Sequence, residues 1–272
     1  MQGTGQGWPW RRVGITGASS GLGAALAREL AAPGRVLHLA GRDAARLAAT
    51  AAACRAAGAE VAEAAFDVTD APAAADWVRG AGGLDLLIAN AGTSAGTGGA
   101  HEAPDQVAHI FAVNLTGALN TILPALEMMR AQTPGADGIR GRVAAIASIA
   151  AFTASPGAPA YCASKAALQR WTEATDATAR REGLRLHAIC PGFIRTPMTA
   201  RNNFPMPFLM EPEDAARRTL AGIARGKARV AFPRALYAAA RLGDALPPAW
   251  LSRLPAKSGP DSPEPPPPPR TG

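Results

Sequence analysis

Lysine and tyrosine are scarce in this chain of 272 residues, which carries 28 basic and 21 acidic side chains. Lysine stands only at positions 165, 227 and 257, so the net charge of +7 comes almost entirely from arginine. The basic side chains are scattered, and no run of about five or six gathers them into a nucleic-acid-binding surface. We therefore expect no nucleic-acid partner.

Cysteine is also rare, and its spacing argues against two common uses. Cys54, Cys162 and Cys190 form no C-x-x-C pair, and an odd count leaves one thiol outside any disulfide pairing. A reduced, cytoplasmic chain is the better expectation. The four histidines show no ligand spacing, so we expect no metal site. The residues after Arg11 and Arg12 are interrupted by glycine and lack the apolar core of a secretion signal.

Long hydrophobic runs are absent as well. No window approaches the roughly 18 unbroken apolar residues of a membrane span. Apolar residues nevertheless make up 48% of the chain and charged residues only 18%, a balance that excludes a largely disordered polymer. The composition predicts a soluble globular core.

Short apolar runs alternate with longer segments of helical spacing, rich in alanine, leucine and arginine. The predicted strands are Arg12–Thr16, Arg35–Ala40, Val61–Phe66, Leu84–Ala89, Arg142–Ser148, Leu184–Cys190 and Arg229–Phe232. The predicted helices are Leu22–Ala32, Asp43–Ala57, Ala73–Arg79, Asp105–Met129, Ala158–Arg181 and Glu213–Arg225. Strands that are apolar on both faces and separated by helices indicate an α/β fold: a doubly wound parallel sheet of about seven strands with helices on both faces.

Composition divides the chain into four parts. Residues 1–10 are glycine-rich and predict a flexible arm, and residues 11–233 hold the repeating β-α pattern. Residues 234–254 interleave apolar side chains with arginine and predict a helical extension. A membrane-surface helix is one reading, but two consecutive prolines break the segment, which favours packing across the crevice or at a subunit interface. Residues 255–272 are proline-rich and predict a disordered tail.

A glycine-rich loop joins the first predicted strand to the first predicted helix. Its sequence is Thr16-Gly17-Ala18-Ser19-Ser20-Gly21-Leu22-Gly23. Glycines at such a junction let the backbone turn tightly and approach a pyrophosphate, while the free N–H groups of the helix start face the anion. The loop therefore predicts nucleotide binding at the carboxyl edge of the sheet.

Further motifs follow in order along the chain. They are Asp67-Val68, Asn90-Ala91-Gly92, Asn114, Ser148, Tyr161-x3-Lys165 and Pro191-Gly192-x3-Thr196. Together with the glycine loop, they resemble the fingerprint of the short-chain dehydrogenase/reductase family, single-domain type, over about residues 12–232. The resemblance implies a Rossmann-like fold that binds NAD or NADP, oxidoreduction of a carbonyl/alcohol pair, and a homodimer or homotetramer. The family's usual glycine-rich ending after the last strand is missing here.

The end of the second predicted strand bears on cofactor choice. Gly41 stands where an NAD-selecting acid is expected, and Arg42 follows it. A guanidinium can grip a 2′-phosphate with two parallel hydrogen bonds, so NADP is favoured. The alternative is NAD, with Asp43 turned inward to replace the missing acid. By resemblance, Asp67 and Val68 contact the adenine, although a helix N-terminal acid is a second reading of Asp67.

Tyr161 and Lys165 lie four residues apart in an alanine- and leucine-rich segment, which places them on one face of a helix. An ammonium about 5 Å from the phenol, at an effective dielectric of about 20, favours the phenolate by roughly 3 kcal/mol, or somewhat over two pKa units. That brings the tyrosine into the range where it can exchange a proton with a substrate oxygen. A tyrosine and a lysine at this spacing, in a chain with so few of each, predict a catalytic pair.

The resemblance extends the site to other residues. Ser148 would hold the substrate oxygen against Tyr161, and Asn114 would hold a water that links Lys165 to solvent, although a polar filler within a helix is a second reading of Asn114. The expected cofactor contacts are Gly17, Ser19, Ser20, Gly21, Leu22, Gly23, Arg42, Asp67, Val68, Asn90, Ala91, Gly92, Tyr161, Lys165, Pro191, Gly192 and Thr196.

The segment Met198–Met210 is rich in phenylalanine, methionine and proline and predicts a cover over an apolar portion of the substrate. The alternative is that these residues pack on the helix that starts near Glu213. The sequence thus predicts an NADP-dependent oxidoreductase that moves hydride between the nicotinamide and a carbonyl or alcohol. The alternatives are an NAD-dependent alcohol dehydrogenase of the same fold and a dinucleotide-sensing protein without turnover. The identity of the substrate is not encoded in any motif.

Overall fold

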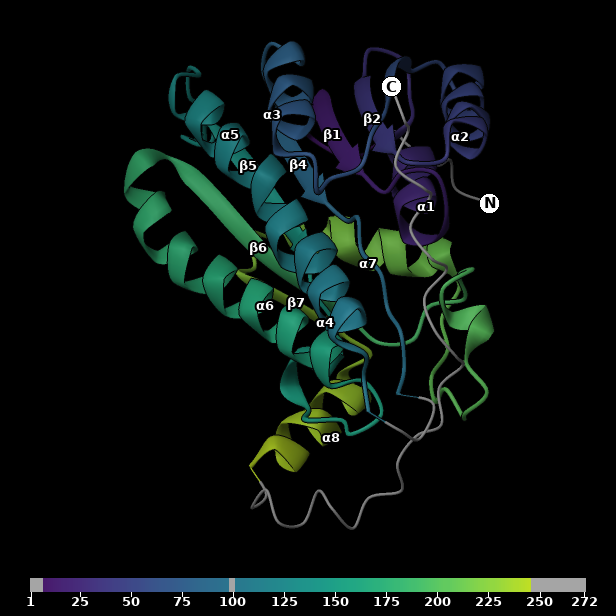
Figure 1. Ribbon diagram of the computed structural model, residues 1–272. Coiled ribbons are helices and arrows are strands. Elements are labelled where there is room, and N and C mark those ends of the chain that lie inside the picture. Colours follow the sequence, from purple (N-terminus) through teal and green to yellow (C-terminus); the bar gives the residue numbers. More distant parts are fainter. Residues whose placement is uncertain (1–6, 98–100, 246–272) are drawn as a thin grey trace.

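Seven parallel strands form one sheet in the order β3-β2-β1-β4-β5-β6-β7 in this computed structural model, which describes residues 7–97 and 101–245 (Figure 1). The strands are β1 Arg12–Thr16, β2 Val36–Gly41, β3 Glu60–Ala65, β4 Leu86–Ala89, β5 Gly141–Ile146, β6 Leu184–Pro191 and β7 Arg229–Phe232. The strand order reverses between β1 and β4. In a sheet of this kind, ligands bind beyond the carboxyl ends of the strands at that reversal.

Helices cover both faces of the sheet (Figure 1). They are α1 Gly21–Leu30, α2 Ala44–Ala56, α3 Ala71–Gly80, α4 Pro104–Phe111, α5 Ala118–Arg130, α6 Pro159–Ala179, α7 Pro212–Ala224 and α8 Arg234–Asp244. Successive residues of β4 enter opposite cores: Leu86 and Ile88 pack with α1, α2 and α7, while Leu87 and Ala89 pack with α5 and α6. This two-sided burial confirms the predicted doubly wound α/β fold.

One predicted helix is interrupted. The segment expected to run unbroken over Asp105–Met129 consists of α4, a π-helical turn at Ala112–Gly117 and α5. Such π turns are rare and occur within α-helices, often at functional sites. The helical periodicity of the sequence could not have predicted this one. The stretch Pro104–Arg130 has the length and composition of a membrane span, but parts of it, such as Ile122 and Met129, are fully buried in the core.

A second boundary differs at the end of β5. The predicted strand continued to Ser148, but β5 ends at Ile146. Ser148 instead caps a short 3-10 helix, η2, at Ile149–Phe152, where its Oγ accepts a hydrogen bond from the backbone N–H of Ala150 at 3.1 Å. Serine side chains commonly satisfy the free N–H groups at a helix start.

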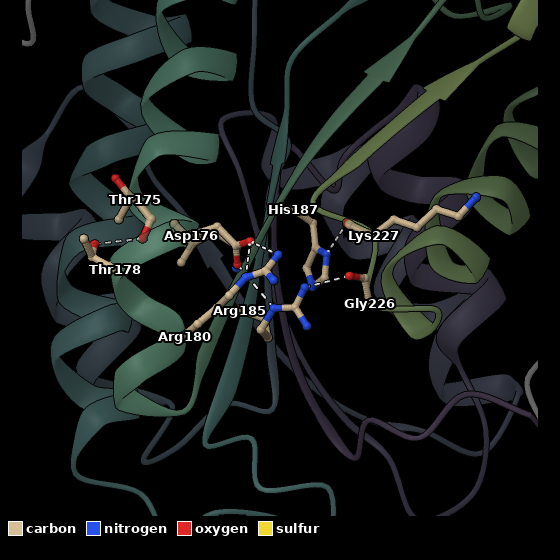
Figure 2. Close-up of polar contacts among 9 residues, drawn as sticks. Thr175, Asp176, Thr178, Arg180, Arg185, His187, Gly226 and Lys227 are labelled. Carbon is tan, nitrogen blue, oxygen red and sulfur yellow. Dashed lines mark hydrogen bonds and ion pairs between the residues drawn. The ribbon is translucent and has the colours of Figure 1, made fainter.

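A charged cluster fastens α6 to the amino-terminal end of β6 (Figure 2). The carboxylate of Asp176, 2% exposed, accepts hydrogen bonds from Arg180 at 2.6 Å and from the backbone N–H of Leu186 at 2.9 Å, and it pairs with Arg185 at 3.3 Å. β7 pairs with β6 only from Ala188 onward, so the N–H of Leu186 has no partner on β7. The Asp176 carboxylate accepts its hydrogen bond instead. Burial raises the pKa of Asp176, but these hydrogen bonds and charges hold it below its usual value.

Of the predicted amino-terminal arm, residues 1–6 lie outside the described residues, whereas Trp8 and Trp10 pack on the domain. Near the amino end, Trp10 is 2% exposed in the core and stacks on Trp8, with ring centroids 6.2 Å apart. The carbonyl of Trp8 accepts a hydrogen bond from Arg35 at 2.7 Å. Of the predicted C-terminal extension, the structure shows α8 as a helix, while its remainder from residue 246 and the proline-rich tail lie outside the described residues.

Candidate active site

A cleft of about 710 Å³ opens at the carboxyl ends of the central strands. Most of the residues singled out in the sequence line it: Gly17, Ser19, Ser20, Gly21, Leu22, Arg42, Asp67, Val68, Asn90, Ala91, Gly92, Ser148, Tyr161, Lys165, Pro191, Gly192 and Thr196. Gly23 and Asn114 are buried beneath its walls. The structure thus brings together motifs that are separated by up to 179 residues of sequence, from Gly17 at one end to Thr196 at the other.

The glycine loop forms a cradle in which side chains have no room. Gly17 and Gly21 adopt φ angles of +65° and +53°, which favour glycine. A Cβ on Gly23 would lie 2.2 Å from the carbonyl oxygen of Gly17, so α1 packs against the loop only with glycine there. The first turn of α1 contains no acidic side chain, and its start faces the cleft. These features fit a dinucleotide pyrophosphate.

Hydrogen bonds join the ends of β1 and β4. The side chain of Asn90 donates to the carbonyl oxygens of Thr16 at 3.0 Å and Gly17 at 3.2 Å. In return, the hydroxyl of Thr16 accepts hydrogen bonds from the backbone N–H groups of Asn90 and Ala91. The two strand ends that flank the reversal are therefore held as one unit.

Tyr161, in the first turn of α6, projects into the cleft beside Ser148. Burial raises the pKa of the Tyr161 phenol above its usual value, and a hydrogen bond with the Ser148 side chain offsets only part of this rise. Ser148 thus contacts the one phenol in the cleft among the described residues. A hydroxyl that points at both the phenol and the open cleft can align an oxygen between them.

Lys165 lies one helical turn beyond Tyr161 and is 4% exposed. Its Nζ donates a hydrogen bond to the carbonyl oxygen of Ile146 at 2.8 Å and lies 5.9 Å from the centroid of the Tyr161 ring. Burial lowers the pKa of Lys165 to about 8. The ammonium is therefore held close to the phenol and gives up its proton more easily than an exposed lysine.

Asn114 lies in the π turn and is fully buried. Its side chain pairs with the backbone of Thr93, accepting from the N–H at 2.8 Å and donating to the carbonyl at 3.0 Å, and it donates to Ser164 at 3.1 Å. A Cβ placed on Gly92 would lie 3.2 Å from Asn114 Oδ1 and 3.3 Å from Lys165 Nζ. The polar ends of Asn114 and Lys165 therefore converge on the same glycine.

The far end of the cleft lies beyond β2 and β3. Arg42 is exposed, and its guanidinium is 3.5 Å from the carboxylate of Asp67. Asp43 caps α2: it accepts a hydrogen bond from the backbone N–H of Arg46 at 2.9 Å and pairs with the Arg46 side chain at 2.7 Å. Val68 is buried. Burial raises the pKa of Asp67, but hydrogen bonds from Thr69 and the charge of Arg42 hold it below its usual value.

The segment after β6 lines the opposite end of the cleft. The N–H of Gly192 donates to the carbonyl of Phe232 at 2.8 Å, and the Thr196 side chain packs against Gly21 at the start of α1. Beyond it, Met198 and Phe208 are 40% and 58% exposed. Met198 lines the cleft, whereas Met210 packs against the core cluster that contains Ala215 of α7. The expected cover over the substrate stays a prediction.

Several lining residues were not predicted: Arg46, Thr93, Ser94, His109 and Arg201. Helical spacing could have indicated two of them, because Arg46 lies four residues after Arg42 and His109 four before Val113, which also lines the cleft. Thr93 and Ser94 simply extend the Asn90-Ala91-Gly92 motif. Across residues 7–97 and 101–245, no group of three histidine, cysteine or acidic side chains gathers as metal ligands.

The sequence of this chain is similar to those of known proteins. Residues 11–205 match the short chain dehydrogenase family. An uncharacterized oxidoreductase of Myxococcus xanthus is 41% identical over 243 residues, covering 88% of this chain and 93% of the relative. A putative ketoacyl reductase of the granaticin polyketide synthase of Streptomyces violaceoruber is 35% identical and covers 69% of each chain.

A solved short-chain dehydrogenase/reductase from Burkholderia phymatum, in complex with NAD, has a TM-score of 0.74 and 25% sequence identity. The match covers 89% of this chain and 94% of that one. The relatives found by sequence and by structure are oxidoreductases, reductases and dehydrogenases. The chain belongs to the short-chain dehydrogenase family, as an NAD(P)-dependent oxidoreductase.

Proposed function

We propose that the protein is an NADP-dependent oxidoreductase that interconverts a carbonyl and an alcohol on a substrate with an apolar portion. The observation that carries this proposal is the convergence of Ser148, Tyr161 and Lys165 on one cleft that also contains the dinucleotide cradle. A protein that only senses dinucleotides has no need for a phenol placed beside both a serine hydroxyl and a lysine ammonium. For that reason, a binding protein without turnover is the weaker alternative.

Each side chain has a separate task in this proposal. Bound NADP, held by the glycine loop, the Asn90-Ala91-Gly92 segment and the Pro191–Thr196 segment, supplies or accepts the hydride. Tyr161 exchanges the proton with the substrate oxygen, and Ser148 aligns that oxygen by hydrogen bonding. Lys165 favours the phenolate through its charge. Asn114 holds the Thr93 backbone beside Lys165 and supports a proton path to solvent.

The choice of NADP rests on Arg42 and Asp43. Arg42 is exposed at the cleft end, and its one ion pair among the described residues is the long contact with Asp67 at 3.5 Å, so its guanidinium can turn to bind a 2′-phosphate. The alternative, selection of NAD by Asp43, requires a carboxylate that is already engaged in capping α2. Asp67 and Val68 would contact the adenine, as the resemblance implies. The Burkholderia phymatum relative was solved with NAD, which makes NAD the alternative to be tested.

The segment Met198–Met210 bears on the substrate class. Met198 lines the cleft and exposes apolar surface, which suits a hydrophobic group next to the carbonyl. The similarity to a putative ketoacyl reductase supports a carbonyl substrate of this kind. We further infer a cytoplasmic homodimer or homotetramer, without a nucleic-acid partner and without need of a membrane surface.

The direct test is a panel of carbonyl compounds with graded apolar chains, followed by loss of NADPH or NADH absorbance. We expect turnover with NADPH, faster for ketones with longer chains than for short hydrophilic ones. Faster turnover with NADH would contradict the cofactor assignment, and failure of the whole panel with both cofactors would favour the sensing protein.

A further inference from the structure

A cluster of aromatic and charged side chains joins α8 to the turn that carries Ser148. Ser148 begins this turn: its Oγ accepts from the N–H of Ala150 and its carbonyl accepts from the N–H of Ala151, each at 3.1 Å. The turn ends four residues later at Phe152, which is 1% exposed. The Phe152 ring and the Ser148 hydroxyl therefore belong to the same hydrogen-bonded turn of backbone.

Phe152 is held by groups from outside its own turn. The ring of Tyr237, on α8, meets it edge to face, with centroids 5.1 Å apart and planes at 76°. The guanidinium of Arg229, the first residue of β7, lies 5.1 Å from the ring centroid, and that of Arg241 lies 5.6 Å from it. Edge-to-face pairs and cations near aromatic rings each favour a defined ring position.

Arg229 is the centre of the cluster. Its guanidinium binds the carboxylate of Glu173 on α6 through two contacts, one of them 2.5 Å from Nη2 to Oε2, and Nη1 donates to the Tyr237 hydroxyl at 2.8 Å. One side chain thus links β7, α6 and α8. The pairing with Glu173 raises the pKa of Arg229, so the charge is permanent. A bidentate pair of this kind fixes orientation as well as contact.

α8 also contacts the loop on the nicotinamide side of the cleft. A Cβ on Gly192 would lie 2.9 Å from Cδ2 of Leu236, which shows how closely this helix packs against the segment after β6. Leu236 and Tyr237 belong to the apolar cluster that also contains Ala147, Ile149 and Phe152. α8 therefore packs against the residues that follow β5 and against the segment that follows β6.

We propose that Arg229 and Tyr237 are positioning residues, which act through Phe152 to hold the Ser148 hydroxyl at the place where it meets the substrate oxygen. The inference rests on the proposed function and deepens it, because it makes α8 part of the catalytic apparatus. Arg229, Tyr237 and Phe152 do not line the cleft. Because Phe152 and Ser148 belong to the same turn, the effect of Arg229 and Tyr237 on Ser148 passes through the backbone of that turn.

A loosened turn has a specific chemical consequence. The Ser148 hydrogen bond lowers the pKa of Tyr161, so a Ser148 that spends less time in place leaves the phenol with a higher pKa. Alcohol oxidation requires the phenolate, so its rate would then rise only at higher pH. A change in overall stability alone would not move this profile.

The test uses two conservative variants and one control on the same helix. Tyr237→Phe keeps the ring but removes the hydroxyl, and Arg229→Lys keeps the charge but not the planar fork. Leu242→Ala alters α8 at a side chain that is 73% exposed. For each variant, kcat, the KM for the cofactor, the pH profile of oxidation and amide hydrogen exchange at residues 150, 151 and 153 are measured.

We expect Tyr237→Phe and Arg229→Lys to lower kcat by about five- to tenfold, the effect of losing one hydrogen bond, with the KM for cofactor within about twofold. Their oxidation profiles should move to higher pH, and the three amides should exchange faster. Leu242→Ala should match the wild type in all four measurements.

The proposal is overturned if the two variants behave like Leu242→Ala, if exchange is faster while kcat and the pH profile are unchanged, or if activity falls only in proportion to the folded fraction. Hydrogen exchange also separates this inference from the function on which it rests. A wild-type chain that reduces no carbonyl would count against the proposed function, whereas unchanged exchange in Tyr237→Phe would count against the role of α8 alone.

Discussion

Burial acts in opposite directions on the two titratable side chains at the centre of the cleft. It raises the pKa of Tyr161, which opposes formation of the phenolate, and it lowers the pKa of Lys165 to about 8. The hydrogen bond with Ser148 and the nearby ammonium both favour the phenolate. The sequence could predict the pairing of Tyr161 with Lys165 from their spacing, but not the strength of burial, which depends on everything packed around α6.

At the residue scale, the first prediction concerns cofactor choice. Arg42→Ala should weaken NADP binding by roughly 1.5 to 3 kcal/mol and leave NAD binding almost unchanged, because it removes a charge-assisted hydrogen bond to the 2′-phosphate. Calorimetric titration with each cofactor measures both affinities. Arg79→Ala is the matched control: Arg79 is also exposed and paired with an acid, Asp76, but lies outside the cleft. Equal losses for NADP and NAD would refute the assignment.

The second prediction concerns the stability cost of Lys165. Because its pKa falls from 10.5 to about 8, the buried charge costs about 3 kcal/mol of folding free energy at neutral pH. Lys165→Met should therefore be inactive yet more stable by about 2 kcal/mol at pH 7, after about 1 kcal/mol is subtracted for the lost hydrogen bond to Ile146.

The pH dependence of that difference follows from the same values. Below pH 8 the lysine is charged in both states and the full cost applies. Between pH 8 and 10.5 the folded chain releases its proton before the unfolded chain does, so the wild type gains stability and the advantage of Lys165→Met disappears. Urea unfolding at pH 7 and pH 10 measures this. An advantage that stays constant with pH would contradict the assigned burial.

At the element scale, hydrophobic patterning predicted the strands and most helix positions because parallel strands buried on both faces are nearly continuous apolar runs. Two functional details escaped it. The π turn that holds Asn114 has no sequence signal, and the end of β5 is set by the choice of Ser148 as a helix cap rather than by hydrophobicity. The first detail depends on hydrogen bonds with a distant segment, such as those between Asn114 and Thr93. The second depends on a local hydrogen bond, from the Ala150 N–H to the Ser148 hydroxyl.

The glycine cradle gives a prediction at the same scale. In Gly23→Ala, the new methyl group would lie 2.2 Å from the Gly17 carbonyl and 2.5 Å from Asn90, so α1 must move away from the loop. We expect a loss of more than about 2 kcal/mol in stability, together with loss of cofactor binding. Gly80→Ala, at the end of α3 with no atom within 4 Å of the new methyl group, should change neither. Retained cofactor affinity in Gly23→Ala would show that the loop is not the binding cradle.

At the scale of the whole molecule, the two ends of the sheet have different tasks. The carboxyl ends carry the cleft, while the amino-terminal end of β6 carries the cluster of Asp176, Arg180 and Arg185 (Figure 2). Family motifs in the sequence revealed the first end in detail and gave no indication of the second. A buried carboxylate that completes a strand edge has no recurrent sequence signature, because its partners are set by the tertiary fold.

This separation predicts how Asp176→Asn behaves. The variant should lose about 3 kcal/mol of stability at pH 7, because two guanidinium groups lose their buried partner, while kcat in the folded state stays unchanged. Since the folded pKa of Asp176 is below its unfolded value, its contribution is present at neutral pH and lost as the pH falls into the acid range. Thermal melts at pH 7 and pH 3 measure the stability of Asp176→Asn. Asp76→Asn is the control, because Asp76 pairs with Arg79 at an exposed position. A fall in kcat would show that the two ends are coupled.

The central claim is that Tyr161 exchanges the substrate proton beside bound NADP, and Tyr161→Phe tests it most directly. The variant keeps the ring and its packing but has no exchangeable proton. The measurement is the steady-state turnover of wild type and Tyr161→Phe on one active carbonyl substrate, with NADPH affinity determined for both by titration. We predict a fall in turnover of at least about a hundredfold, the contribution of a general acid, with NADPH affinity and the thermal midpoint unchanged. Near-normal turnover in Tyr161→Phe would contradict the account, because the proton would then come from another group.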